Sequence, residues 1–137
     1  MEIIISHNEG TPPVAVMQLR GALDGSTYEY FISEAQKLYD AGTRNLILDM
    51  SELTFLSSAG LSALHRTARV FRGEDLSTFE EGWGAIHAMG KERGKGFLEH
   101  IKLLNPSEKI QAVLDTVGFK SFFEIYTEIQ PALASFQ

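Results

Sequence analysis

The sequence has no cysteine, which excludes a disulfide framework, thiolate zinc sites and a cysteine nucleophile. It also has no apolar run near the roughly 20 residues that a membrane-spanning helix needs. Basic residues are few, with 12 Lys and Arg against 18 Asp and Glu, whereas nucleic-acid-binding proteins usually carry a basic patch. The first residues lack the basic region of a secretion signal. We therefore expect a cytoplasmic protein in a reducing compartment that neither spans a membrane nor binds nucleic acid directly.

The chain has 137 residues, of which 44% are hydrophobic, so it can bury one ordinary core. This length predicts a single domain over residues 1–137. Six of the 12 glycines lie between residues 73 and 96, in a stretch without clear periodicity. A connection this long inside a compact domain is usually functional or disordered, and we interpret residues 73–97 as a glycine-rich insertion.

Short apolar runs predict strands, and longer periodic stretches predict helices. The expected strands are residues 2–6, 14–20, 45–50, 101–104 and 122–126. The expected helices are residues 27–41, 58–71, the stretch from Asn105 to Val117, and 128–136. Residues 51–57 are expected to form a loop. Alternating strands and helices predict an α/β fold, with a mixed, mostly parallel sheet of about five strands covered by helices.

Several helix ends carry recognisable signals. Ser26 and Glu29 occupy capping-box positions before the first helix. Asn105, followed by Pro106 and by Glu108, predicts a capped helix start, and Gly118 predicts where that helix stops. The second helix places a buried stripe on one face, made of Leu61, Leu64, Ala68 and Phe71.

The stretch from Phe55 to Leu61 is the most informative site in the sequence, because a strand leads into it and a helix leaves it. The free N–H groups and the dipole of a helix start favour an anion, so a phosphate on Ser58 would be stabilised there. Gly60, which has no side chain, would allow a partner or a phosphate to approach the backbone closely. The alternative is that Ser58 only caps the helix.

Other chemistry has little support. The four histidines show no paired spacing for a metal, and Ser58 does not lie in the GxSxG motif of serine hydrolases. We therefore expect no catalytic residues, no metal and no cofactor, and we expect that the protein is not an enzyme.

Three segments in order along the chain resemble STAS domains, the family of the bacterial anti-sigma factor antagonists. They are Leu46–Leu61, the segment Leu19-Arg20-Gly21-Ala22-Leu23-Asp24, and Ile101–Pro106 together with Val117-Gly118-Phe119. The resemblance implies a regulatory protein-binding module of signal transduction and transcription regulation. Its partners would be an anti-sigma factor that is also a serine kinase, and a phosphatase.

The resemblance also implies which residues act. The phosphate acceptor would be Ser58, with Ser57 as the second choice. The family has an Asp-Ser pair here, and Ser57 stands in place of the Asp. Contacts to the partner would come from Asp24, Gly25, Thr27, Ser57, Ala59 and Gly60. Phosphate on Ser58 would break the complex by charge repulsion and desolvation. The alternative is a STAS-like scaffold or ligand-sensing domain without a phosphorylation cycle, and the sequence leaves a homo-oligomer open.

Overall fold

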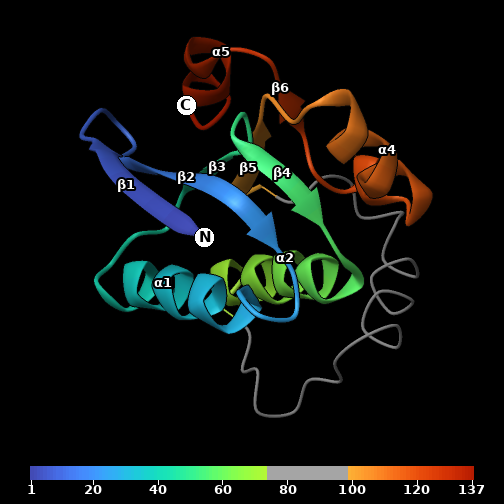
Figure 1. Ribbon diagram of the computed structural model, residues 1–137. Helices are drawn as coiled ribbons and strands as arrows, with labels where there is room; N and C mark the ends of the chain where they lie inside the picture. Colours follow the sequence, from blue (N-terminus) through green and yellow to red (C-terminus); the bar gives the residue numbers. More distant parts are fainter. Residues whose placement is uncertain (74–98) are drawn as a thin grey trace.

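The computed structural model describes residues 1–73 and 99–137, which form a six-stranded sheet with helices on both of its faces (Figure 1). In chain order the elements are β1 (Glu2–Asn8), β2 (Val14–Leu23), α1 (Tyr28–Asp40), β3 (Leu46–Asp49), β4 (Leu53–Leu56), α2 (Ser58–Phe71), β5 (Ile101–Leu104), α4 (Glu108–Thr116), a 3-10 turn (Phe119–Ser121), β6 (Ile125–Tyr126) and α5 (Ile129–Ala134). The insertion expected at 73–97 lies, apart from Gly73, outside the described residues.

The sheet has the strand order β1-β2-β3-β5-β6, and β4 pairs with β2. Only the β1–β2 pair is antiparallel among the paired strands of the described residues, and the other pairs are parallel. The expected α/β class with a mixed, mostly parallel sheet is therefore confirmed. The sheet has one strand more than expected, because β4 forms where a loop was predicted.

Strands β3 and β4 both pair with β2, one after the other along its length. Residues 15–18 of β2 pair with β3, and residues 21–23 of β2 pair with β4. Between the two strands the chain turns at Met50, whose carbonyl accepts from the N–H of Leu53 at 3.1 Å. Gly21 has a φ of +103°. It pairs with Leu53 while the next residue of β2, Ala22, pairs with Phe55, so the extra residue, Thr54, forms a bulge in β4. Strand β4 thus leads the chain from the centre of the sheet to the start of α2.

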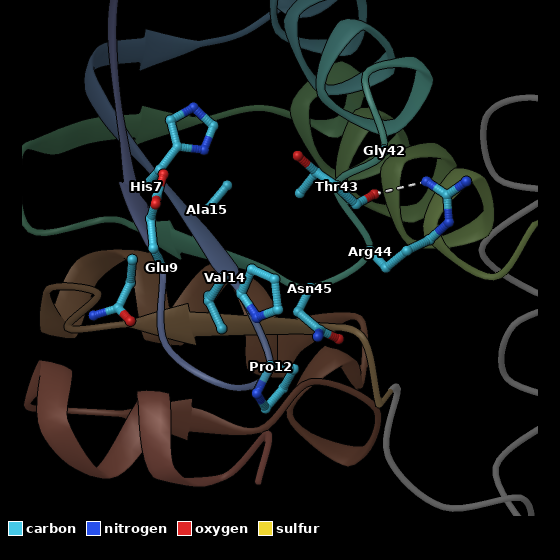
Figure 2. A pocket seen from close by; sticks show the side chains of 11 residues that line it. His7, Glu9, Pro12, Val14, Ala15, Gly42, Thr43, Arg44 and Asn45 are labelled. Carbon is cyan, nitrogen blue, oxygen red and sulfur yellow. Dashed lines mark hydrogen bonds between the residues drawn. The ribbon is translucent and has the colours of Figure 1, made fainter.

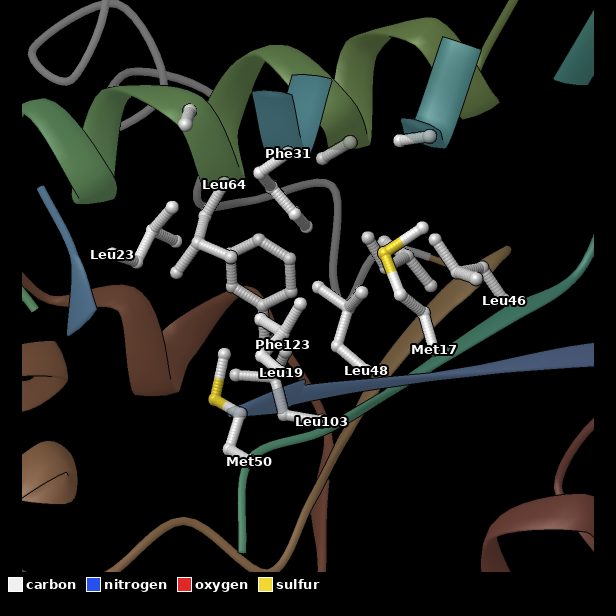
Figure 3. Close-up of a cluster of buried hydrophobic side chains, with 14 of the residues drawn as sticks. Met17, Leu19, Leu23, Phe31, Leu46, Leu48, Met50, Leu64, Leu103 and Phe123 are labelled. Carbon is white, nitrogen blue, oxygen red and sulfur yellow. The ribbon is translucent and has the colours of Figure 1, made fainter. Parts of the chain in front are cut away.

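The larger core lies between the sheet and the pair α1 and α2 (Figure 3). Phe31 of α1 and Leu64 of α2 are fully buried against strand residues such as Met17 and Leu48. All four residues of the predicted stripe on α2 are buried, so the prediction of a core-facing stripe is confirmed. Burial of this apolar surface holds both helices on the sheet.

The opposite face of the sheet is covered in part by α5, through a smaller cluster that includes Ile47, Leu104 and Ala132. Beside this cluster, the buried Lys102 places Nζ 3.3 Å from Glu124 Oε1, and the Tyr126 hydroxyl donates to Glu124 Oε2. The hydrogen bond from Tyr126, with help from Lys102, lowers the pKa of Glu124, and the same bond raises the pKa of Tyr126. A buried lysine is thus balanced by a carboxylate that stays charged.

Two local predictions in the C-terminal part of the chain are wrong. Residues 122–126 do not form one strand: the N–H groups of Phe122 and Phe123 both donate to the carbonyl of Phe119 in a helical turn, which leaves only Ile125–Tyr126 for β6. Ser107 rather than Asn105 caps α4, since its hydroxyl accepts from the N–H of Ile110 at 3.2 Å. Asn105 adopts a φ of +51°, a left-handed conformation that asparagine tolerates better than most residues.

Candidate functional site

The candidate site lies at the carboxyl ends of β2 and β4, where Leu23 pairs with Leu56. The turn after β2 leads into α1, and the residue after β4 begins α2, so two helix starts meet at this edge of the sheet. Ligands of open α/β sheets usually bind at the carboxyl ends of the strands. The structure therefore places side by side the two segments, 24–27 and 57–60, that the family resemblance assigns to one contact surface.

Asp24 organises the first of these segments. Its Oδ1 accepts hydrogen bonds from the Ser26 hydroxyl at 2.6 Å and from the Ser26 N–H at 2.9 Å. Thr27 Oγ1 accepts from the N–H of Asp24 at 3.0 Å and donates to the carbonyl of Ala22 at 2.8 Å. The pKa of Asp24 is lowered by the bonds to its carboxylate, first from the Ser26 side chain, then from the Ser26 N–H, and less from Thr27 Oγ1 at 3.4 Å. The turn thus presents a charged carboxylate beside an exposed Gly25.

The predicted capping box at α1 is wrong. The residue that precedes the helix is Thr27, and its side chain makes no capping hydrogen bond to the start of α1. Ser26 is turned toward Asp24 instead, which satisfies its hydroxyl outside the helix. Asp24 is therefore the residue that stabilises this turn, as aspartate often does.

Ser57 caps α2. Its Oγ accepts from the N–H of Gly60 at 3.2 Å, and its carbonyl accepts the first helical hydrogen bond, from Leu61, at 2.9 Å. The N–H of Ser57 donates to the carbonyl of Leu23 at 3.1 Å, which ties the helix start to the end of β2. The interpretation of Ser58 as the cap is therefore wrong, because the neighbouring serine occupies that position.

Ser58 is the first residue of α2, and it is exposed. Its hydroxyl makes no hydrogen bond to any described residue. The first N–H groups of a helix have no acceptor within the helix. Ser57 Oγ accepts from the N–H of Gly60, and the N–H groups of Ser58 and Ala59 remain without an intrahelical acceptor. The first turn of α2 also carries no acidic residue. A phosphate here would meet two free donors and the positive end of the helix dipole.

Gly60 is buried rather than presented to a partner. A Cβ at this position would lie 2.5 Å from the carbonyl oxygen of Leu23 and 2.7 Å from Leu56 Cδ1. The space beside Gly60 is thus filled by the chain itself. The structure gives this glycine a packing role, and the expected close approach of a partner to its backbone does not fit.

An exposed aromatic residue borders the site and was missed in the sequence. Phe55 on β4 is 46% exposed, and Lys109 Nζ of α4 lies 5.9 Å from the centroid of its ring. The available signal was a large apolar residue three positions before Ser58. The prediction of a loop over residues 51–57 gives no alternation of faces, so it does not indicate on which side Phe55 lies. Phe55 adds an exposed apolar side chain on the strand that leads to the two serines.

A pocket of about 510 Å³ lies at the other end of the sheet, between the β1–β2 loop and the α1–β3 loop (Figure 2). Arg44 extends away from the other labelled side chains, donates to the carbonyls of Tyr39 and Thr43, and stacks over the Tyr39 ring. The guanidinium therefore bonds to residues close to it in the chain, Tyr39 and Thr43.

Within residues 1–73 and 99–137, no cluster of three or more His, Asp or Glu side chains could hold a metal ion. In the same residues no helix has the length and apolar character to cross a membrane.

Several known structures have a fold similar to that of this chain. A putative anti-sigma factor antagonist from Thermotoga maritima matches with a TM-score of 0.68 at 15% identity, over 95% of this chain and 92% of that chain. An anti-sigma factor antagonist from Mycobacterium paratuberculosis matches with a TM-score of 0.67 at 16% identity, over 98% and 92%. The phosphorylated form of the Bacillus cell fate determinant SpoIIAA matches with a TM-score of 0.56 at 18% identity, over 98% and 100%.

No match was found among curated proteins. A family model for the STAS domain matches residues 6–78, which include β2, the Asp24 turn, β4 and the start of α2. This match covers more than half of the chain, and the resemblance noted in the sequence is thereby confirmed. The chain belongs to the STAS domain family.

Proposed function

We propose that this protein is an anti-sigma factor antagonist that acts by binding and is switched by phosphorylation of Ser58. Membership of the STAS family and the likeness of the fold to antagonists support the general role. The observation that carries the switch is the position of Ser58, exposed as the first residue of α2. A kinase can reach this hydroxyl without unfolding any part of the site.

The proposed contact surface combines the turn and the helix start. Asp24, Gly25 and Thr27 supply one part, and Ser57 with Ala59 supplies the other. The hydrogen bond from Ser57 to Leu23 keeps the two parts together. Gly60 acts beneath this surface by packing. The partner would be an anti-sigma factor with serine kinase activity, and a phosphatase would restore the unmodified state.

Phosphate at Ser58 would act through charge. It adds nearly two negative charges at the centre of the contact surface, where a bound partner would have excluded water. Within the free protein, the helix dipole and the N–H groups of Ser58 and Ala59 favour that phosphate by about 0.3–1 kcal/mol. The modified protein is therefore not destabilised, while its complex with the partner is.

The family resemblance implies an aspartate at the position of Ser57, and this departure would affect recognition more than folding. Serine and aspartate cap helices about equally well, so the helix start keeps its geometry. What is lost is one negative charge next to the acceptor. This loss is the observation that favours the alternative function, a STAS scaffold without a phosphorylation cycle.

The acceptor is tested with the partner kinase and ATP on a phosphate-affinity gel. We expect wild type and Ser51→Ala to shift, and Ser58→Ala to remain unshifted. Ser51 is the matched control because it is also exposed and precedes β4. Equal shifts of wild type and Ser58→Ala would move the acceptor elsewhere, with Ser57 the first position to examine.

Binding to the unmodified partner distinguishes the two functions. We expect Ser58→Asp to weaken binding at least about tenfold, since one charge at a buried contact is costly. Ser58→Asn has nearly the same size without the charge, and it should bind like wild type. Unchanged binding of Ser58→Asp would favour the scaffold function, and equal weakening by Asn would show that size rather than charge matters.

A further inference from the structure

Strand β1 is an edge strand of the sheet, first in the strand order (Figure 1). One side of β1 pairs with β2 in an unbroken register from Glu2–Arg20 to Asn8–Val14. In the described part of the chain, no strand pairs with its other side. A free strand edge presents a row of N–H and C=O groups that can accept another strand.

This edge lacks the features that usually prevent such pairing. Residues 2–8 contain no proline, no lysine and no bulge. Instead they contain three consecutive isoleucines. Ile3 and Ile5 pack partly against the larger core, whereas Ile4 points to the other face of the sheet and is 43% exposed. The fold itself gives no reason for an exposed isoleucine at this position.

Charge does not oppose the approach of a second copy at this edge, although the whole chain has a net charge of −6. The single acidic residue of β1 is Glu2, and Arg20 neutralises it through an ion pair of 3.1 Å. The remaining residues of the strand are apolar or polar without formal charge at neutral pH, counting His7 as neutral. The edge is therefore locally close to neutral.

We propose that two copies of this chain form a symmetric dimer by antiparallel pairing of their β1 strands, with the two-fold axis at Ile4. In this register each Ile4 faces its own counterpart, Ile3 faces the counterpart of Ile5, and Glu2 faces the counterpart of Ser6. Directly opposite side chains in such a pair lie about 4.5–5.5 Å apart at Cβ, close enough for the two isoleucines to pack. An isologous interface of this kind closes after two subunits.

Neighbouring registers are less favourable. An axis at Ile3 places the charged Glu2 opposite Ile4, and an axis at Ile5 places Ile4 opposite Ser6. Only the register centred on Ile4 pairs apolar with apolar and polar with polar residues from 2 to 6. The proposed dimer does not depend on the proposed function, because Ser58 and its surroundings lie on β4 and α2.

The test exploits the self-pairing at position 4. Sedimentation equilibrium over a concentration series should show a monomer–dimer equilibrium for wild type. Ile4→Lys and Ile4→Glu should each be monomeric, because two like charges would face each other at the axis. An equimolar mixture of the two variants should recover the dimer. The control is Tyr30→Lys. Tyr30 is also a large exposed hydrophobic residue, but it lies on α1, away from β1, so this variant should behave like wild type.

Three results would overturn the proposal: wild type that stays monomeric at every concentration, Ile4→Lys that associates like wild type, or a mixture that stays monomeric. If the charged variants do not fold, cross-linking decides. Because the chain has no cysteine, Ile4→Cys introduces a single thiol. A short bismaleimide should then join two chains of Ile4→Cys and not of Tyr30→Cys, and failure to join the Ile4→Cys chains would equally contradict the dimer.

Discussion

The missing side chain of Gly60 allows the carbonyl of Leu23 to approach the start of α2. A Cβ on Gly60 would lie 2.5 Å from that oxygen, closer than real Cβ contacts come. The same carbonyl accepts the hydrogen bond from Ser57. One peptide group at the end of β2 therefore sets both the direction and the distance of the helix that carries Ser58.

Gly60→Ala should destabilise the fold. The added methyl group meets backbone, which cannot move aside as a flexible side chain can, and overpacking of this kind costs about 1–3 kcal/mol. The gain of about 1 kcal/mol in helix propensity offsets only part of it. Urea unfolding should show the loss. Gly25→Ala is the matched control, since nothing lies within 4 Å of its Cβ, and its stability should remain near that of wild type.

The two serines at the start of α2 should respond differently to alanine. Ser57→Ala removes the cap and should cost about 1 kcal/mol, whereas Ser57→Asp should retain most of the stability. Ser58→Ala removes an exposed hydroxyl without a described partner and should change stability by less than about 0.5 kcal/mol. Thermal or urea unfolding of the three variants checks this. A larger cost at Ser58 than at Ser57 would show that the cap is misassigned.

Asp24 should titrate below its ordinary pKa of 3.8, because Ser26 donates to it. A lowered folded-state pKa means that charged Asp24 stabilises the fold above the unfolded-state value and that this contribution is lost as the pH falls through the folded-state value. Ser26→Ala should therefore raise the titration midpoint of Asp24, measured by NMR. Ser33→Ala, an exposed serine on α1, should leave it unchanged. Equal midpoints in all three proteins would contradict the assignment.

The pair Lys102 and Glu124 should show the asymmetry of a buried ion pair. Glu124→Gln leaves the buried ammonium group of Lys102 without its counter-charge and should cost about 3 kcal/mol. Lys102→Met removes the buried charge and leaves Glu124 partly exposed with its bond from Tyr126, so the loss should be much smaller. Urea unfolding at neutral pH compares the two. Equal losses would mean that Lys102 reaches water more easily than its burial indicates.

The sequence predicts the bounds of the elements that have a clear hydrophobic pattern. Helix α2 begins and ends where its pattern predicted, from Ser58 to Phe71, and strand β5 likewise occupies residues 101–104. Strand β4 could not be predicted, because its four residues show buried ends and exposed middle positions rather than alternation. It exists because β2 extends past β3 and offers a second stretch for pairing.

The capping residues could be predicted only to within one or two positions. Ser57 and Ser58 are chemically identical as caps, and no local signal separates them. The choice is made by a distant group, the carbonyl of Leu23, which accepts from the N–H of Ser57. In the same way, Asn105 and Ser107 both suit a helix start, and Asn105 is excluded because its N–H donates to the carbonyl of Tyr126 in the left-handed conformation. Long-range contacts thus decided between locally equivalent sequences.

The break between β3 and β4 has a consequence for how the protein can be regulated. Because β4 resumes pairing with β2 immediately before α2, the Asp24 turn and the Ser58 helix start are attached to the same two strand ends, Leu23 and Leu56. The hydrogen bond from the Ser57 N–H to the Leu23 carbonyl joins them as well. A phosphate on Ser58 would therefore place its charge directly beside the Asp24 turn, and a partner that contacts both segments would meet that charge within the contact itself.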